Sequence, residues 1–199
     1  MIAPLFELHA VDWTPPDPQR VDALMLTSAN AATHAGDALA LYAGLPCYCV
    51  GAATASAAER AGLQRIMTGP SDGLALLQLM RAEGVRNVLH LCGREHIALE
   101  HSEMRFERRI VYAADAVPAL PPGAVAALRS GALALIHSPR AGRTFAELAD
   151  AAGISRATVS AAAISPAAAA ALGPGWRAVH AAPRPDDHAL LELAAKLCQ

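Results

Sequence analysis

Short apolar segments alternate with longer alanine- and leucine-rich segments, and this alternation restricts the possible fold more than any other feature of the chain. One longer segment covers residues 71–84, where Ser71 or Asp72 can cap a helix and Gly84 can end it. Strands that alternate with helices favour a parallel sheet with helices on both faces. The predicted strands are residues 23–27, 46–50, 65–67, 87–91, 110–113, 133–137, 159–164 and 178–181.

Two proline-rich segments interrupt this alternation, at residues 12–20 (DWTPPDPQR) and 116–123 (AVPALPPG). They enclose a block about as long as one small domain. The strand-like segments LFELHAV and RRIVYAAD flank the block, and a chain that enters and leaves in this way predicts a two-stranded hinge. We therefore predict a discontinuous first lobe of residues 1–11 and 115–199, and an inserted second lobe of residues 12–114.

Charge and hydropathy exclude several classes of protein. The net charge is −2 and there is no long basic run, which argues against binding to nucleic acid. No apolar segment is long enough to span a bilayer, so no membrane interaction is expected. The start, MIAPLFELHA, lacks the basic and long apolar regions of a signal peptide, so we expect a cytoplasmic protein.

The cysteines and histidines predict neither a disulfide framework nor a metal site. None of the four cysteines forms a C-x-x-C motif, and buried thiols are expected at Cys47, Cys49, Cys92 and Cys198. The eight histidines are scattered, and His90 with Cys92 does not make a metal site. Neither G-x-S-x-G nor G-x-G-x-x-G occurs, which argues against hydrolase and dinucleotide-enzyme functions.

Turns with small or hydroxyl-bearing residues recur where predicted strands end. ALMLTSANAA and LALIHSPRAG each join a strand to a helix through serine, CYCVGAATASAAERAGL and VSAAAISPAAAAAL repeat the pattern, and NVLHLCGREH adds a fifth turn. In open α/β sheets, ligands bind outside the carboxyl ends of the strands, where helix N-termini favour carboxylate or phosphate. A serine or threonine at such a turn can also serve only as a helix cap. The repetition predicts a site for a polyanion.

Seven segments, in this order, resemble the uroporphyrinogen-III synthase family: TSANA, VGAATASAAERAGL, LHLCGREH, RIVYAADAV, ALALIHSPRAGRTF, AAISPAAAAAL and HAAPRPDDHALLELA. The resemblance implies two flavodoxin-like parallel-sheet domains of α/β class, joined by a two-stranded linker. It also implies a cofactor-free lyase (hydro-lyase) of haem biosynthesis. Its substrate would be hydroxymethylbilane, which the enzyme cyclises with inversion of the last pyrrole ring and loss of water.

The same matching implies the site residues. Tyr112, in RIVYAADAV, corresponds to the tyrosine that assists departure of the hydroxyl group, although a tyrosine on a strand can equally be a packing residue. No metal ligand is implied. The candidates for binding substrate carboxylates are Thr27, Ser28, Thr54, Gly93, Arg94, Ser138 and Ser165.

One departure from the family pattern leaves an alternative open. Members of the family usually begin with a strand and helix carrying a Thr-Arg-Pro turn, whereas this chain begins at the segment that follows them. The alternative is a non-catalytic two-lobed protein that binds a polyanion, or a shortened, inactive member of the family. The expected state is a monomer, or a dimer if the shortened N-terminus exposes a sheet edge.

Overall fold

The computed structural model describes residues 2–69 and 72–198, and the chain divides into two compact units. Unit 1 consists of Met1–Glu7 and Ala116–Gln199, and unit 2 consists of Leu8–Asp115. The chain therefore crosses between the units at residues 7/8 and 115/116. The sequence predicts these junctions at residues 11/12 and 114/115.

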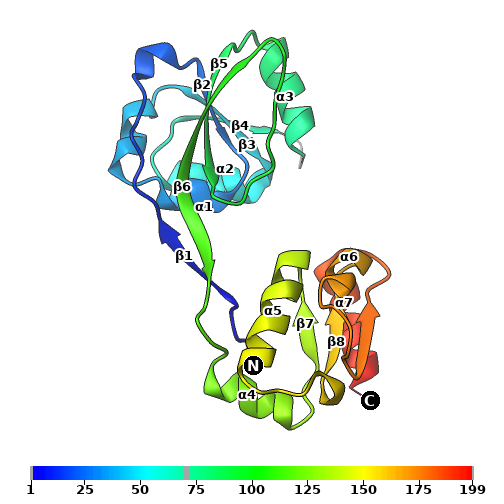
Figure 1. The fold of residues 1–199 in the computed structure, drawn as a ribbon. Helices are drawn as coiled ribbons and strands as arrows, with labels where there is room; N and C mark the ends of the chain where they lie inside the picture. Colours follow the sequence, from blue (N-terminus) through cyan, green and yellow to red (C-terminus); the bar gives the residue numbers. More distant parts are fainter. Residues whose placement is uncertain (1, 70–71, 199) are drawn as a thin grey trace. The chain divides into compact units, whose positions relative to one another are not determined.

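The larger sheet lies mainly in unit 2 (Figure 1). Its strands are β1 (Phe6–Ala10), β2 (Ala23–Leu26), β3 (Pro46–Val50), β4 (Arg65–Gly69), β5 (Asn87–Gly93) and β6 (Arg105–Ala116). Within the described residues the order is β1-β6-β5-β2-β3-β4, and all neighbours from β6 to β4 pair in parallel. β1 is antiparallel to β6, because Val11 N–H donates to the Val111 carbonyl and Val117 N–H donates to that of Leu5.

Helices cover both faces of this sheet because successive strand side chains point to opposite sides. Leu24 and Leu26 of β2 pack in one core with α1 (Ala29–His34) and α2 (Gly51–Arg60). Met25, which lies between those two leucines, packs in the opposite core with α3 (Gly73–Ala82). The expected arrangement of helices on both faces is thus confirmed in this unit.

The start of α3 shows how a local signal sets a helix boundary. The Asp72 carboxylate accepts hydrogen bonds from the N–H groups of Leu74 and Ala75, at 2.8 and 3.0 Å, and so satisfies two donors that the first turn leaves without helical partners. Asp72 is therefore a cap. Ser71, the other cap that the sequence allowed, lies outside the described residues.

Unit 1 contains a smaller parallel sheet and, among its described residues, four α-helices. The elements are β7 (Ala134–Ile136), β8 (Ser160–Ala163), β9 (Ala178–Ala181), α4 (Pro122–Arg129), α5 (Pro139–Ala151), α6 (Pro166–Ala170) and α7 (Asp187–Leu197), and the strand order in the described part of the chain is β7-β8-β9. Ala161 and Ala163 pack on one face with α4, α5 and α6, and Ala162 packs on the other face with α7. Gly142 lets α5 approach α6, since a Cβ there would lie 2.9 Å from the Ala168 carbonyl oxygen.

Every predicted strand has a counterpart, and the largest difference is at β6. The sequence predicted residues 110–113, whereas β6 runs from Arg105 to Ala116. The strand is longer because its first half pairs with β5 and its second half lies beside β1, so pairing partners hold both ends. The expectation of buried thiols is confirmed for Cys47, Cys49 and Cys92 and is wrong for Cys198, which is exposed beyond the end of α7.

Candidate functional site

The carboxyl ends of β2 and β5 lie side by side in unit 2 and bring two predicted turns together. Leu26 of β2 pairs with Leu91 of β5, so the chain continues into Thr27 and Ser28 on one strand and into Gly93 on the other. Parallel pairing places both turns at one edge of the sheet, which is where open α/β folds bind ligands.

Ser28 is the N-cap of α1. Its hydroxyl oxygen accepts a hydrogen bond from Asn30 N–H at 3.2 Å. Because the backbone uses only the oxygen, the hydroxyl proton of Ser28 remains able to donate to an anion. The capping role and a binding role are therefore compatible. With six residues, α1 has a small macrodipole, so the hydroxyl and backbone N–H groups are the main donors here.

Gly93 and Tyr112 are in direct contact at the end of β5. They are partners in the register of β5 and β6, beside a bulge between Cys92 and Gly93. An ideal Cβ on Gly93 would lie 2.6 Å from Tyr112 Cζ and 2.8 Å from its hydroxyl oxygen. The phenol therefore occupies the space that any other residue at position 93 would need. The half-buried Tyr112 also lies near the His34 ring of α1, with 6.1 Å between the ring centroids.

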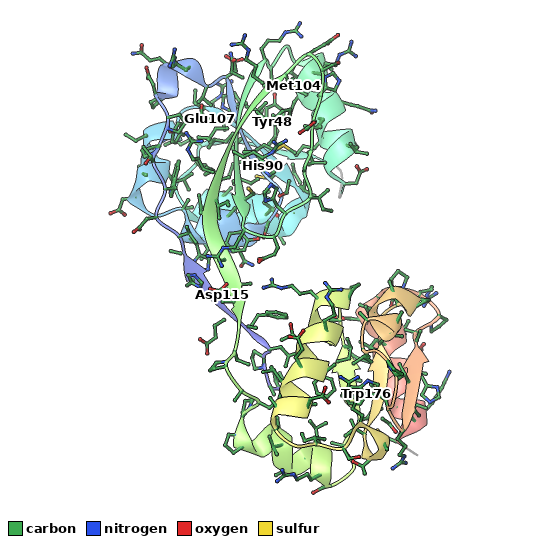
Figure 2. The ribbon with its side chains drawn as sticks, in the orientation of Figure 1. Tyr48, His90, Met104, Glu107, Asp115 and Trp176 are labelled. Atoms are coloured by element: carbon green, nitrogen blue, oxygen red, sulfur yellow. The ribbon has the colours of Figure 1, made fainter. Side chains whose placement is uncertain are left out.

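Arg94 forms hydrogen bonds to β6 through both its backbone and its side chain. Its N–H donates to the Tyr112 carbonyl at 3.0 Å, and its Nη1 donates to Asp115 Oδ1 at 2.6 Å. Asp115, which Figure 2 shows on β6, also lies 3.5 Å from His9 Nε2. The side chains of Arg94, Asp115 and His9 are all about half exposed, so a substrate carboxylate would have to compete with Asp115 for the guanidinium.

A buried histidine, His90, joins the two turns, and sequence reasoning missed it. His90 lies in the middle of β5 with 0% exposure, and Figure 2 shows it inside unit 2. Its Nε2 lies 3.3 Å from Thr27 Oγ1. Burial, with smaller contributions from His96 and Arg108, lowers the pKa of His90 to about 4, so the imidazole is neutral at physiological pH. The signal available in the sequence is a lone histidine inside the apolar run NVLHLC, since a histidine there needs a specific polar partner.

His96 connects His90 to Gly93. The rings of His96 and His90 meet edge to face, with centroids 6.0 Å apart. His96 Nδ1 lies 2.9 Å from the Gly93 carbonyl oxygen, and since a carbonyl only accepts, Nδ1 is the donor. Contacts and hydrogen bonds thus link Thr27, His90, His96, Gly93 and Tyr112 in one connected group.

Thr54 is placed differently from the other candidates of unit 2. It lies in α2 with 5% exposure, so its hydroxyl is not open to a ligand in this conformation. The start of α2 is open instead, because Val50 is the N-cap residue and no side chain caps the helix. At this turn the backbone N–H groups after β3 are better placed to meet an anion than the Thr54 side chain.

Ser138 and Ser165 lie together in unit 1. Ile136 of β7 pairs with Ala163 of β8, and each serine follows two residues later. Both are N-caps: Ser138 Oγ accepts from Ala141 N–H at 3.0 Å, and Ser165 Oγ accepts from Ala168 N–H at 3.2 Å. As at Ser28, each hydroxyl retains a proton to donate. Their role in binding stays a prediction.

Metal-ligand clusters and membrane-spanning helices are both absent from the described residues. Within residues 2–69 and 72–198, no three His, Cys, Asp or Glu side chains are arranged as metal ligands. Among the helices that the structure describes, none has both the length and the apolar character needed to cross a bilayer. A cavity of about 690 Å³ in unit 1 lies between residues 2–6, α4, β7 and α5, and none of the predicted site residues lines it.

Comparisons with known proteins point to one family. The family model described as uroporphyrinogen-III synthase HemD matches residues 1–192. The crystal structure of uroporphyrinogen-III synthetase from Helicobacter pylori is similar, with a TM-score of 0.69 and 21% identity over 97% of this chain and 91% of that one. At that identity the likeness shows a shared fold. No curated protein matches the chain at a significant level.

Two structures of uroporphyrinogen III synthase from Thermus thermophilus are more distant. The wild-type structure has a TM-score of 0.46 and 20% identity, over 91% of this chain and 79% of that one. A mutant structure has a TM-score of 0.48 and 20% identity, over 92% and 80%.

Proposed function

Because the chain belongs to the uroporphyrinogen-III synthase family, as the match over residues 1–192 shows, we propose that it is a lyase acting on hydroxymethylbilane. It closes this linear tetrapyrrole into uroporphyrinogen III, inverting the last pyrrole ring and releasing water. The substrate carries an acetate and a propionate on every pyrrole. It is thus a polyanion of the kind that the hydroxyl-bearing turns predict.

The reaction breaks one C–O bond before it forms any ring bond. The terminal hydroxyl leaves and takes up a proton to become water, while loss of a pyrrole N–H proton leaves an azafulvene electrophile. The last ring attacks through its substituted carbon and forms a spiro intermediate. That intermediate fragments and recloses with the last ring turned over. Since the uncatalysed closure does not invert, the protein has to hold the chain curled and favour one closure.

The observation that carries the residue assignment is the gathering of Thr27, Ser28, Gly93 and Tyr112 at one edge of the larger sheet. A polar edge of this kind supplies hydroxyl and backbone donors to carboxylates without any cofactor. The donors are neutral, apart from Arg94, in accord with a chain whose net charge is −2.

Tyr112 assists departure of the hydroxyl group in this proposal. A phenol is a poor acid near neutral pH, so its part is a hydrogen bond donated to the leaving oxygen rather than full proton transfer. Two observations support this role. The ring contacts both Gly93 and His34, and the Tyr112 hydroxyl oxygen lies 2.8 Å from the place of a Cβ on Gly93, at the turn that carries Arg94.

The remaining candidates bind substrate carboxylates. Ser28, Ser138 and Ser165 each keep a hydroxyl proton after capping a helix. The Arg94 guanidinium can donate two parallel hydrogen bonds to a substrate carboxylate once it releases Asp115. Thr54 contributes through the backbone of its turn, since its side chain is buried.

The test is a coupled assay in which the protein receives freshly formed hydroxymethylbilane and the products are oxidised and separated as type III and type I porphyrin isomers. We expect type III from the wild-type chain. Type I alone would overturn the proposed function and leave a non-catalytic polyanion-binding protein. Binding of hydroxymethylbilane without turnover would identify that alternative directly.

Tyr112→Phe tests the assigned role of the phenol. We expect the rate of type III formation to fall about 100-fold, since one positioned hydrogen-bond donor to an oxygen that gains negative charge contributes about that much. Tyr48→Phe is the matched control. It removes a hydroxyl from the same unit, but that hydroxyl donates to Glu83 at the end of α3 rather than lying at the site. Equal rates for the two variants would remove Tyr112 from the mechanism.

A further inference from the structure

The contact between His90 and Thr27 joins residues 63 positions apart and reaches into the proposed binding turn. Thr27 is half-buried at the end of β2, whereas the imidazole of His90 is wholly enclosed. A buried polar side chain with one specific partner usually has its orientation fixed by that partner. The direction of this hydrogen bond therefore decides which way the Thr27 hydroxyl points.

The surroundings of the other ring nitrogen decide that direction. His90 Nδ1 and Arg108 Nε are both buried, and neither has a hydrogen-bond partner among the described residues. His90 and Arg108 are also partners in the register of β5 and β6. The Arg108 guanidinium always carries its charge and acts electrostatically on His90, so a bare, accepting Nδ1 suits this neighbour better than a protonated Nδ1. A neutral imidazole with a bare Nδ1 carries its proton on Nε2.

We propose that His90 is a positioning residue that donates from Nε2–H to Thr27 Oγ1, so that the Thr27 hydroxyl proton points outward to a substrate carboxylate. A threonine hydroxyl has one proton and can accept as well as donate. If the oxygen accepts from His90, the proton stays available for an anion. This inference rests on the proposed function, and it adds one residue to the binding apparatus without contact between that residue and the substrate.

His96 holds the ring of His90 in place. It packs edge-on against His90 while its Nδ1–H is bound to the Gly93 carbonyl. Rotation of the His90 ring would therefore have to displace a side chain anchored in the neighbouring turn. These contacts connect the Thr27 hydroxyl to Gly93, which packs against Tyr112. The group that binds a carboxylate and the group that assists the reaction therefore keep a fixed position relative to each other.

Two amide substitutions at position 90 form a matched pair. In His90→Gln the amide nitrogen reaches the place of Nε2 and can donate to Thr27, whereas in His90→Asn the shorter side chain reaches only the place of Nδ1. We expect the KM for hydroxymethylbilane to rise about tenfold in His90→Asn, with kcat within about twofold of wild type, and to stay near wild type in His90→Gln. Equal KM values for the two variants, each folded by circular dichroism, would overturn the proposal.

Coupling to Thr27 supplies a second readout. Thr27→Val alone should raise KM about tenfold, and adding His90→Asn to it should raise KM no further, because both changes remove the same interaction. A double variant whose KM rises by the product of the single effects would contradict the proposal, because it would show that His90 acts independently of Thr27.

The tautomer can be measured without substrate. Nitrogen NMR of the wild-type chain with labelled histidine distinguishes a protonated Nε2 from a protonated Nδ1, and His90→Gln assigns the signal. We expect Nε2–H, and a protonated Nδ1 would refute the inference even if the chain makes the type III isomer. Conversely, Nε2–H in a chain that makes only type I would mean that the proposed function fails while the geometry at Thr27 holds.

Discussion

Gly93→Ala is the change that tests most directly whether the turn after β5 positions Tyr112. The added Cβ would lie 2.6 Å from Tyr112 Cζ, and ordinary contact begins near 3.4 Å, so the ring has to retreat by about 0.8 Å. Overpacking of this kind costs about 1–3 kcal/mol of folding free energy. A catalytic group displaced by about 1 Å can lose about 100-fold in rate. We therefore expect both stability and type III formation to fall.

The two effects can be measured separately. Urea unfolding of unit 2 can be followed through Trp13, which donates to the Ala35 carbonyl at 2.8 Å, in a Trp176→Phe background that removes the tryptophan of unit 1. The rate comes from the isomer assay. A loss of about 2 kcal/mol in the free energy of unfolding, together with a rate loss of one to two orders of magnitude, is expected.

Two controls identify the cause of the loss. Gly44→Ala introduces the same methyl group into the same unit, where nothing lies within 4 Å, and should leave stability and rate close to wild type. In a Tyr112→Ala background the ring is gone, so Gly93→Ala should cost little further stability. If Gly93→Ala behaves like Gly44→Ala, or destabilises equally without the ring, then Tyr112 is not held in the way described.

Three further predictions concern other parts of the chain. Ser138→Ala should lower the free energy of unfolding of unit 1 by about 1 kcal/mol, because α5 loses its N-cap, whereas Ser138→Asp should keep most of the wild-type stability. Trp176 fluorescence in a Trp13→Phe background follows this unfolding. Burial lowers the pKa of His90 to about 4, so as the pH falls the unfolded chain takes up a proton on this histidine before the folded chain does. The wild-type free energy of unfolding should therefore fall by about 3 kcal/mol between pH 6.5 and pH 4 on account of His90. Urea unfolding of His90→Leu should lack this part of the decline. A thiol reagent should modify Cys198 rapidly in the native protein and the other three cysteines only after unfolding, and rapid modification of more than one thiol would contradict their burial.

The contact network at the sheet edge changes how the polar residues of the site are understood. The serine-bearing turns predict anion binding through helix N-termini, yet α1 and α6 have only six and five residues. The binding groups in such short turns are individual hydroxyl protons and backbone N–H groups. Their directions therefore matter more than the summed helix dipole, and that is why a buried residue that orients one hydroxyl becomes relevant to function.

The sequence alone determined the features that depend on neighbours a few residues apart. Alternating apolar segments predicted the parallel α/β class and nearly all strand positions. The turns at strand ends allowed helix caps at Ser138 and Ser165, and the structure has both. The motifs identified the family that the match over residues 1–192 shows. These signals are local because caps, turns and side-chain periodicity are set by hydrogen bonds and spacing within one or two turns of the chain.

Only the tertiary structure decided which distant residues meet. The register of β2, β5 and β6 brings Thr27 to His90 and Gly93 to Tyr112, and it pairs Arg94 with Asp115. Neither the burial of Thr54 nor the exposure of Cys198 could be predicted from its residue type. Pairing of parallel strands depends on how helices pack across both faces of a sheet, and a shift of one residue would exchange the faces, so no short segment contains that information.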